Sequence, residues 1–274
     1  MLELEHGFRV VDVHARLHVD AGASHAAGPR IDPEALERHL HQAGVVRAVV
    51  FPPATGSGGY LRANNAVARH AIDRPFVALA RLGGPRDPGA SVGSRLRNLT
   101  AERDDHHAGP EDVERYAYGD RFHGFRLDPQ VDGLPDAETL DAVADAGLPV
   151  FVHGGRGFTP GMAADVLLGR GVPVVQSHFG GHPLDRRGMA EALALLDDHD
   201  DYYLDTCAVR YRDLLERALR EHPNRVLFGS GAPDVHPNVA VMELLTLDVP
   251  EDAMARAFDA NPCRVLPALA AQRS

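Results

Sequence analysis

Eight short apolar runs, separated by amphipathic segments, are the feature that most limits what this chain can fold into. Each run is rich in Val, Leu and Phe and ends near Gly, Pro or a polar residue, as strands buried on both faces do. The runs lie at residues 8–14, 45–53, 76–84, 122–129, 148–155, 172–181, 202–208 and 225–233. The segments between them, such as 32–44, 136–147 and 211–223, have helical periodicity. This alternation predicts parallel strands joined by helices.

Eight strand–helix repeats in 274 residues predict an α/β fold of one domain, a (β/α)8 TIM barrel over residues 1–274. A doubly wound open sheet is the competing fold. Only residues 83–121 interrupt the alternation, and this long polar stretch predicts a helical insertion or lid after the third strand. No linker, low-complexity tract or longer repeat divides the chain, so we expect a single domain.

Charge and composition exclude several kinds of partner and chemistry. The net charge is −11, whereas a surface that binds nucleic acid is basic. No apolar run approaches the roughly 20 residues that span a bilayer, and the N-terminus lacks a signal-peptide pattern. We therefore expect a cytoplasmic protein that binds neither nucleic acid nor membrane, with residue usage typical of a bacterial gene of high GC content. All 28 basic residues are Arg, which excludes catalysis through a lysine Schiff base.

Histidines gather where three of the runs end. In a barrel, catalytic side chains lie at the carboxyl ends of the strands. The first run ends at His14 and is followed by Arg16, the fifth contains His153, and the sixth contains His178. Because these ends meet at one mouth of a barrel, the three histidines indicate a shared site. We predict catalytic roles for His14, His153 and His178 and for the neighbouring Arg16.

Further charged side chains lie at other strand ends. They are Arg81, Arg126, Arg156 and Asp205. Taken together, the arginines favour a small anionic or carboxylated substrate, because focused positive potential would attract it to an acidic protein. Each arginine taken singly could equally form a structural ion pair. Asp205 could orient an imidazole, and we interpret Cys207 as a packing residue.

Five motifs occur in order along the chain: VDVHARLH, PVFVHGG, VVQSHFGG, VLFGSGAP and NPCRVL. They resemble the amidohydrolase superfamily, in the branch of small lactonases, carboxylate decarboxylases and related hydrolases. The resemblance covers nearly the whole chain and implies a (β/α)8 barrel whose mouth holds one or two divalent metals. The implied ligands are a His-x-His on the first strand, a His on the fifth and an Asp that closes the eighth. The His on the sixth strand is implied as a further ligand or as the acid/base.

Two of these implied ligand positions are changed. His14, His153 and His178 match family histidines, whereas Arg16 stands in place of the second His and Gly231 in place of the Asp. Neither residue can coordinate a cation through its side chain. Adding a guanidinium and removing a carboxylate is the paired change that would abolish a cation site.

Three interpretations of the altered site stay open. The favoured one is a metal-free site without a cofactor, in which Arg16 supplies the positive charge and the histidines act as general acid and base. The alternative is a rearranged site in which His14, His153 and His178 bind a single divalent metal, zinc or manganese. The third is an inactive barrel retained for binding.

The resemblance implies hydrolysis of a lactone or amide, or decarboxylation, of a small carboxylated compound. A metal-free site would equally suit elimination, dehydration, cyclisation or isomerisation. In either case Arg126 would bind a carboxylate and His153 or His178 would move protons. Barrels of this type often pair, so a homodimer is a further expectation.

Overall fold

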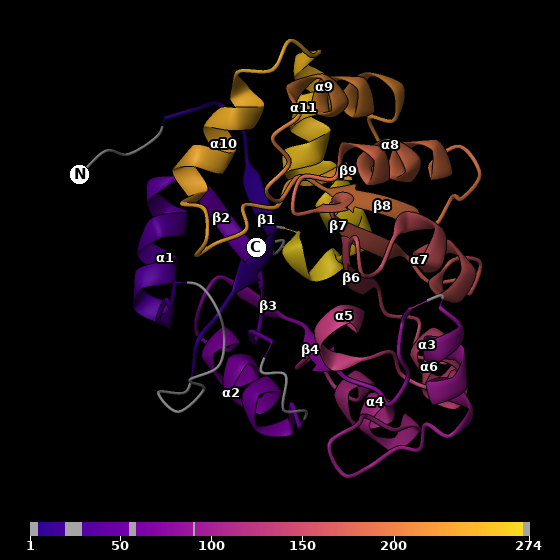
Figure 1. Cartoon of the computed structure of the whole chain (residues 1–274). Coiled ribbons are helices and arrows are strands. Elements are labelled where there is room, and N and C mark those ends of the chain that lie inside the picture. Colours follow the sequence, from indigo (N-terminus) through magenta and orange to yellow (C-terminus); the bar gives the residue numbers. More distant parts are fainter. Residues whose placement is uncertain (1–4, 20–28, 55–58, 90, 271–274) are drawn as a thin grey trace.

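The computed structural model of the chain describes residues 5–19, 29–54, 59–89 and 91–270. Parallel strands surround its centre and helices lie outside them (Figure 1). The strands are β1 (Val10–Arg16), β2 (Val45–Phe51), β3 (Phe76–Ala78), β4 (Ala80–Leu82), β5 (Phe125–Leu127), β6 (Val150–Gly155), β7 (Val174–His182), β8 (Tyr202–Asp205) and β9 (Val226–Leu227). They pair in chain order, β1 to β3 in one sheet and β4 to β9 in the other.

Two junctions join these sheets into one eight-stranded barrel. β3 and β4 are parts of a single run that is divided at Leu79, so that β3 pairs with β2 and β4 pairs with β5. At the other junction, the Val13 N–H donates to the carbonyl of Phe228 and the Gly231 N–H to that of His14, both at 2.9 Å. The predicted (β/α)8 barrel is thus confirmed, and the closure excludes the open sheet.

The helices follow the strands and cover the barrel. They are α1 (Pro33–Gln42), α2 (Leu61–Ala71), α3 (Val92–Leu99), α4 (Pro110–Ala117), α5 (Pro129–Asp132), α6 (Ala137–Asp145), α7 (Pro160–Leu167), α8 (Arg186–Leu195), α9 (Arg212–Glu221), α10 (Pro237–Leu245), α11 (Glu251–Ala255) and α12 (Asn261–Val265). Side-chain caps start several of them, as when Asp32 accepts from the Ala35 N–H at 2.7 Å. None of the helices in the described ranges has the length and apolar character needed to cross a membrane.

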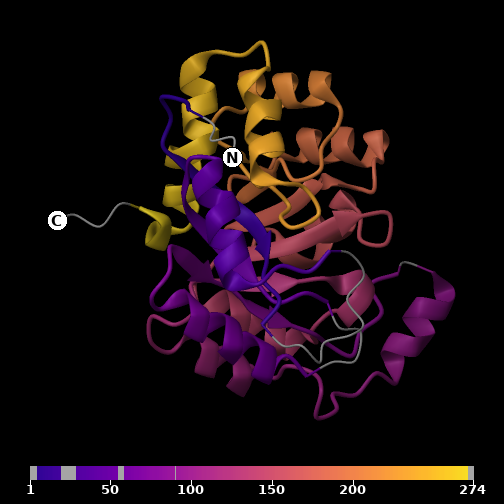
Figure 2. The ribbon, with the colours of Figure 1, turned by 90° about the vertical axis from the view of Figure 1, so that its left-hand side faces the viewer.

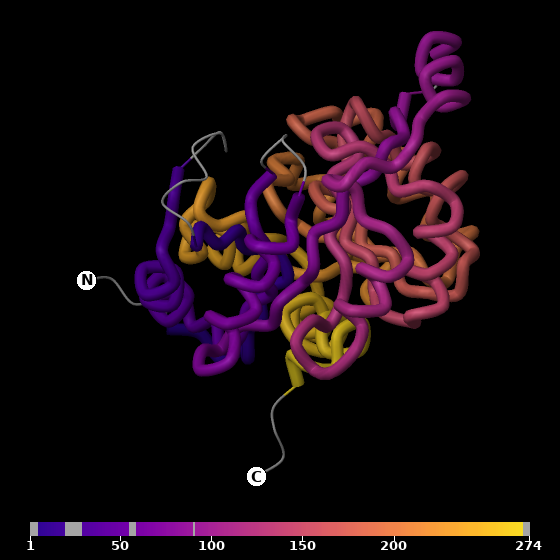
Figure 3. The backbone as a smooth tube through the Cα atoms, turned by 90° about the horizontal axis from the view of Figure 1, so that it is seen from below, coloured from indigo at the N-terminus to yellow at the C-terminus, as the bar shows by residue number. Residues whose placement is uncertain are grey.

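The polar stretch at 83–121 forms two helices that differ in their surroundings. α4 packs against α6 in the outer layer, whereas α3 stands away from the barrel (Figures 2 and 3). Val92, Leu96 and Leu99 of α3 are exposed. That this stretch is an insertion and acts as a lid stays a prediction.

Two apolar cores lie on the two faces of the barrel wall. The larger core fills the space between strands and helices, while Val11, Val13 and Phe151 belong to a second core inside the barrel. Val265 and Leu269, from the C-terminal segment, complete this inner core. The segment lies at the amino ends of the strands, where the Leu269 carbonyl accepts a hydrogen bond from the side chain of Arg9 at 2.8 Å. Since that end is filled, the opposite, carboxyl end is where a site can open.

Asp12 fixes the closure of the barrel and the strand that carries His14. Its fully buried Oδ1 accepts from the backbone N–H groups of His14 and Ser230, both at 2.9 Å. The Ser230 hydroxyl is hydrogen-bonded to Oδ2. Burial raises the pKa of Asp12 to about 7. One carboxyl group therefore ties β1 to the segment that follows β9.

We expect Asp12→Ala to lower the free energy of unfolding by about 2–4 kcal/mol, because it leaves two buried N–H groups and a hydroxyl without their partner. Asp12→Asn retains an amide oxygen for the two N–H groups and should cost about 1 kcal/mol. Denaturant unfolding of the two variants beside the wild type measures both values. Equal losses in the two variants would show that the hydrogen bonds to Asp12 contribute little.

Candidate active site

A cavity of about 330 Å³ opens at the carboxyl ends of the strands. Six of the eight predicted site residues line it: His14, Arg16, Arg81, Arg126, His153 and His178. Asp205 is fully buried and bonded to residues of the lining. Arg156 is exposed and does not belong to the lining.

Four histidines form a cluster in this cavity. The ring centroids of His14 and His178 lie 5.1 Å apart, and those of His153 and His178 lie 4.7 Å apart. His182, the last residue of β7, is the fourth member, at 4.9 Å from His153 and 4.8 Å from His178. His182 was not predicted as a site residue, although HFGGH places it only four residues after His178, at the end of the same run. The left-handed backbone at His178, Phe179 and Gly180 turns the chain between the two histidines.

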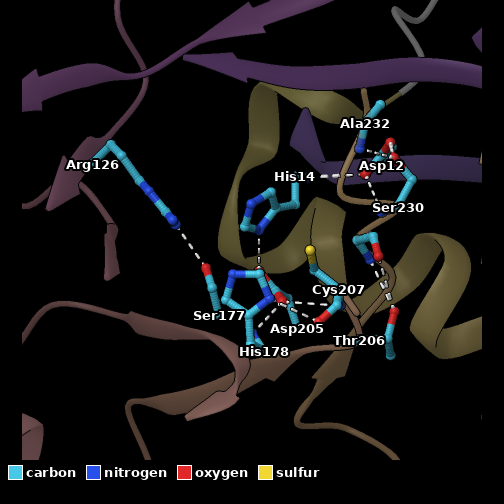
Figure 4. A network of polar contacts seen from close by, with 11 residues as sticks. Asp12, His14, Arg126, Ser177, His178, Asp205, Thr206, Cys207, Ser230 and Ala232 are labelled. Carbon is cyan, nitrogen blue, oxygen red and sulfur yellow. Dashed lines mark hydrogen bonds and ion pairs between the residues drawn. The ribbon is translucent and has the colours of Figure 1, made fainter. Parts of the chain in front are cut away.

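Asp205 and the backbone of Cys207 orient two of these rings (Figure 4). Asp205 Oδ2 lies 2.9 Å from His14 Nδ1, and Oδ1 accepts from the backbone N–H of His178 at 2.9 Å. The Cys207 carbonyl lies 2.9 Å from His178 Nδ1. Because a carbonyl and an ionised carboxylate only accept, Nδ1 carries the proton in both rings. The lone pair of each neutral ring is therefore on Nε2.

The protonation states follow from burial and from neighbouring charges. Burial lowers the pKa of all four imidazoles, and the Arg126 guanidinium lowers that of His153 further. Burial alone would raise the pKa of Asp205, but His14 and His178 hold it below its usual value. At neutral pH the cluster thus consists of neutral imidazoles beside an ionised carboxylate, suited to accept protons or to bind a metal.

Two of the three cavity arginines form ion pairs. Arg81 lies 2.7 Å from Asp132 and 3.1 Å from Asp128. Arg16 pairs with Asp234, whose carboxylate is exposed. Both guanidinium charges are therefore offset by carboxylates of this chain.

The third cavity arginine, Arg126, is in a different environment from Arg81 and Arg16. Its side chain is 2% exposed and lies over the Phe51 ring, 4.6 Å from the centroid. Nη1 donates to the Ser177 hydroxyl at 2.7 Å, while the buried Nε has no hydrogen-bond partner. Among the described residues, no carboxylate forms an ion pair with it. Burial lowers the pKa of Arg126 to about 10, so the group stays charged at neutral pH.

The Cys207 side chain occupies the space in the cavity wall that a side chain at residue 231 would need. Gly231 has φ +77°, and a Cβ at this residue would lie 2.5 Å from Cys207 Sγ. The sulfur thus fills the volume of a side chain at 231, the position where the resemblance implies an Asp. Burial raises the pKa of the Cys207 thiol well above its usual range. Cys207 also borders the cavity.

Two of the three predicted metal ligands, His14 and His178, have the spacing of a metal site together with Cys207, whereas His153 does not belong to this group. One side-chain donor atom from each of His14, His178 and Cys207 lies within 4.8 Å of the other two. Asp205 and the Cys207 carbonyl orient the rings, as partners of metal-binding histidines do. Nitrogen and sulfur donors suit zinc, whereas manganese prefers oxygen.

We expect Gly231→Ala to lower the free energy of unfolding by about 2–4 kcal/mol, because the new Cβ overlaps the Cys207 sulfur and φ is positive. In the Gly231→Ala/Cys207→Ala variant the nearest remaining atom is the Cβ of residue 207, at 3.9 Å. The double variant should recover about 1–2 kcal/mol relative to additivity. Denaturant unfolding of both single variants and the double variant completes the cycle. Strictly additive losses would show that the two residues do not compete.

The chain is similar to known proteins over almost its full length. Residues 11–268 match the family model described as amidohydrolase. No curated protein matches the sequence. Among solved structures, a 5-carboxyvanillate decarboxylase from Sphingomonas paucimobilis is 15% identical with a TM-score of 0.63, over 95% of this chain and 99% of that one. A 2,6-dihydroxybenzoate decarboxylase from Rhizobium is 13% identical with a TM-score of 0.66, over 94% and 98%.

A third structure with this fold is a probable 2-pyrone-4,6-dicarboxylic acid hydrolase from Acinetobacter baumannii. It is 16% identical with a TM-score of 0.63, over 94% of this chain and 98% of that one. At such identities the similarity of the structures establishes the barrel. The family model spans nearly the whole sequence, and the chain therefore belongs to the amidohydrolase family of enzymes.

Proposed function

We propose that this enzyme binds the carboxylate of a small substrate at Arg126 and acts on that substrate through histidine acid–base chemistry. The buried guanidinium of Arg126 supports this proposal most directly. It lies in the cavity with the four imidazoles and has no carboxylate partner among the described residues. An unpaired buried cation is costly. A substrate carboxylate that accepts its hydrogen bonds would offset that cost.

His153 and His178 are the candidates for proton transfer. Burial lowers the pKa of both rings, so both are unprotonated at neutral pH, the state that a general base requires. In a metal-free site His178 Nε2 would take up and return the proton, because Nδ1 is bonded to the Cys207 carbonyl. In a metal-dependent site that nitrogen would bind the metal, which leaves the proton transfer to His153. His182 is exposed and close to both rings, so it would exchange the proton with water.

The named compounds of the similar structures support a carboxylated substrate. Carboxyvanillate, dihydroxybenzoate and pyrone dicarboxylic acid all carry carboxylates. We therefore infer decarboxylation or hydrolysis of a small carboxylated compound as the reaction class. Elimination, cyclisation or isomerisation are the alternatives for a site that uses its own side chains alone. The unpaired charge of Arg126 favours a bound anion in a catalytic barrel and in one retained for binding alike.

The role of a metal depends on Arg16. In the metal-free version of the site, Arg16 would supply the positive charge. Its ion pair with Asp234 offsets that charge and thereby favours the second candidate, a metal-dependent enzyme. In that version the histidine cluster would hold one divalent ion in the cavity. A bound metal would supply an acidified water or polarise a substrate carbonyl.

We expect small aromatic and cyclic carboxylates to raise the melting temperature of the wild type, while their uncharged amides do not. Arg126→Gln should bind the same carboxylates about 10–100-fold more weakly, the range for loss of a charged hydrogen bond. Arg156→Gln, which changes an exposed arginine, is the matched control and should respond as the wild type does. A thermal-shift titration of the three proteins checks this. Equal carboxylate affinity in Arg126→Gln and the wild type would overturn the proposed binding role.

We expect protein purified without chelator to contain about one equivalent of zinc, the content of a single catalytic zinc site. Elemental analysis measures it. The comparison is a variant that restores the implied ligands, Arg16→His/Gly231→Asp, and that also carries Cys207→Ala to clear the space at 231. A metal-free wild type beside a metal-loaded variant would instead support the metal-free site.

A further inference from the structure

The thiol of Cys207 is held in the cavity through its own backbone. The Cys207 N–H donates to Asp205 Oδ1 at 3.1 Å, and its carbonyl accepts from His178 Nδ1 at 2.9 Å. Both backbone groups are therefore bonded to the residues that orient the histidines. The side chain is 3% exposed, and Sγ forms no hydrogen bond with any residue in the described part of the chain. The sulfur is thus positioned without a structural partner.

Glycine at 231 is what gives the sulfur this position. Any side chain at 231 would meet Sγ, since even a Cβ would come within 2.5 Å of it. The two residues lie just beyond the ends of neighbouring strands, Cys207 after β8 and Gly231 after β9. A donor that the segment after β9 lacks can therefore be supplied from the segment after β8, at nearly the same point in space.

We propose that Cys207 is a metal ligand, a thiolate that binds a zinc-like cation together with His14 and His178 in place of the missing carboxylate at 231. This inference rests on the metal-dependent version of the proposed function. Three protein donors leave a fourth position open, as in catalytic zinc sites. When the sulfur–metal bond forms, the thiol proton leaves to solvent, and the sulfur carries one negative charge, as the absent carboxylate would.

Thiolate ligation makes the site selective in a way that carboxylate ligation would not. Sulfur donors favour zinc and cobalt, whereas manganese, magnesium and calcium favour oxygen. With His14 and His178 as the other donors, we therefore expect the protein to take up zinc or cobalt and to leave magnesium in solution. The two imidazoles already disfavour magnesium, and the sulfur of Cys207 strengthens the preference for zinc.

The test is a cobalt titration of the metal-stripped protein, because a thiolate bound to Co²⁺ gives a charge-transfer absorption band in the near ultraviolet that imidazole ligands do not give. We expect this band to saturate at about one Co²⁺ per chain in the wild type. Cys207→Ser should lose the band and bind Co²⁺ at least ~10-fold more weakly. Even the loss of a residue that only supports a metal ligand lowers metal affinity by that factor. Cys263→Ser is the matched control and should keep the band, because Cys263 lies on α12 and is bonded to Asp259.

Three results would overturn the proposal: no Co²⁺ binding by the wild type, binding without the band, or a band that persists in Cys207→Ser. Unfolding curves of the variants check that each is folded. X-ray absorption of the zinc-loaded wild type needs no variant and should show one sulfur at about 2.3 Å from zinc. A zinc shell without sulfur would equally overturn it. Carboxylate binding at Arg126 is measured separately, so a cobalt result against Cys207 leaves that part of the proposed function standing.

Discussion

The hydrogen bonds of the Asp205 carboxylate are the interaction on which the site depends. From the end of β8, the carboxylate bonds to the His14 ring on β1 and to the backbone of His178 on β7. It also accepts from the N–H of Cys207. The backbone at His178 has φ 61°, a left-handed conformation that costs about 1–3 kcal/mol for a residue with a side chain. The bond from the His178 N–H to Asp205 helps to hold this conformation, which turns the ring toward the cavity.

Most of the barrel was predictable because each strand is recognised from a short stretch of consecutive residues. Strands buried on both faces appear as short apolar runs, and the polar residue that ends each run marks the carboxyl end of a strand. His14, His153 and His178 were found by that rule alone, without any knowledge of how the strands pair. The division of the third strand at Leu79 was not predicted, because the change of pairing partner leaves no mark on the sequence.

The parts of the site that escaped prediction depend on which loops become neighbours. From the sequence, Gly231 indicates only that the Asp implied by the resemblance is absent. The fold shows in addition that the Cys207 sulfur fills the space of a side chain at 231. The partners of the arginines are hidden for the same reason. Arg81 pairs with acids from α5 and the residue before it, and Arg16 with Asp234, whereas Arg126 has no such partner among the described residues. Identical residue types at equivalent strand ends therefore have different charge environments.

The overlap between Cys207 and position 231 also limits how this chain can change over evolutionary time. With cysteine at 207, a side chain introduced at 231 meets the sulfur. With a shorter residue at 207, the space at 231 opens but the sulfur is gone. A carboxylate at 231 therefore requires two substitutions, and either one alone creates a steric overlap or removes the thiol.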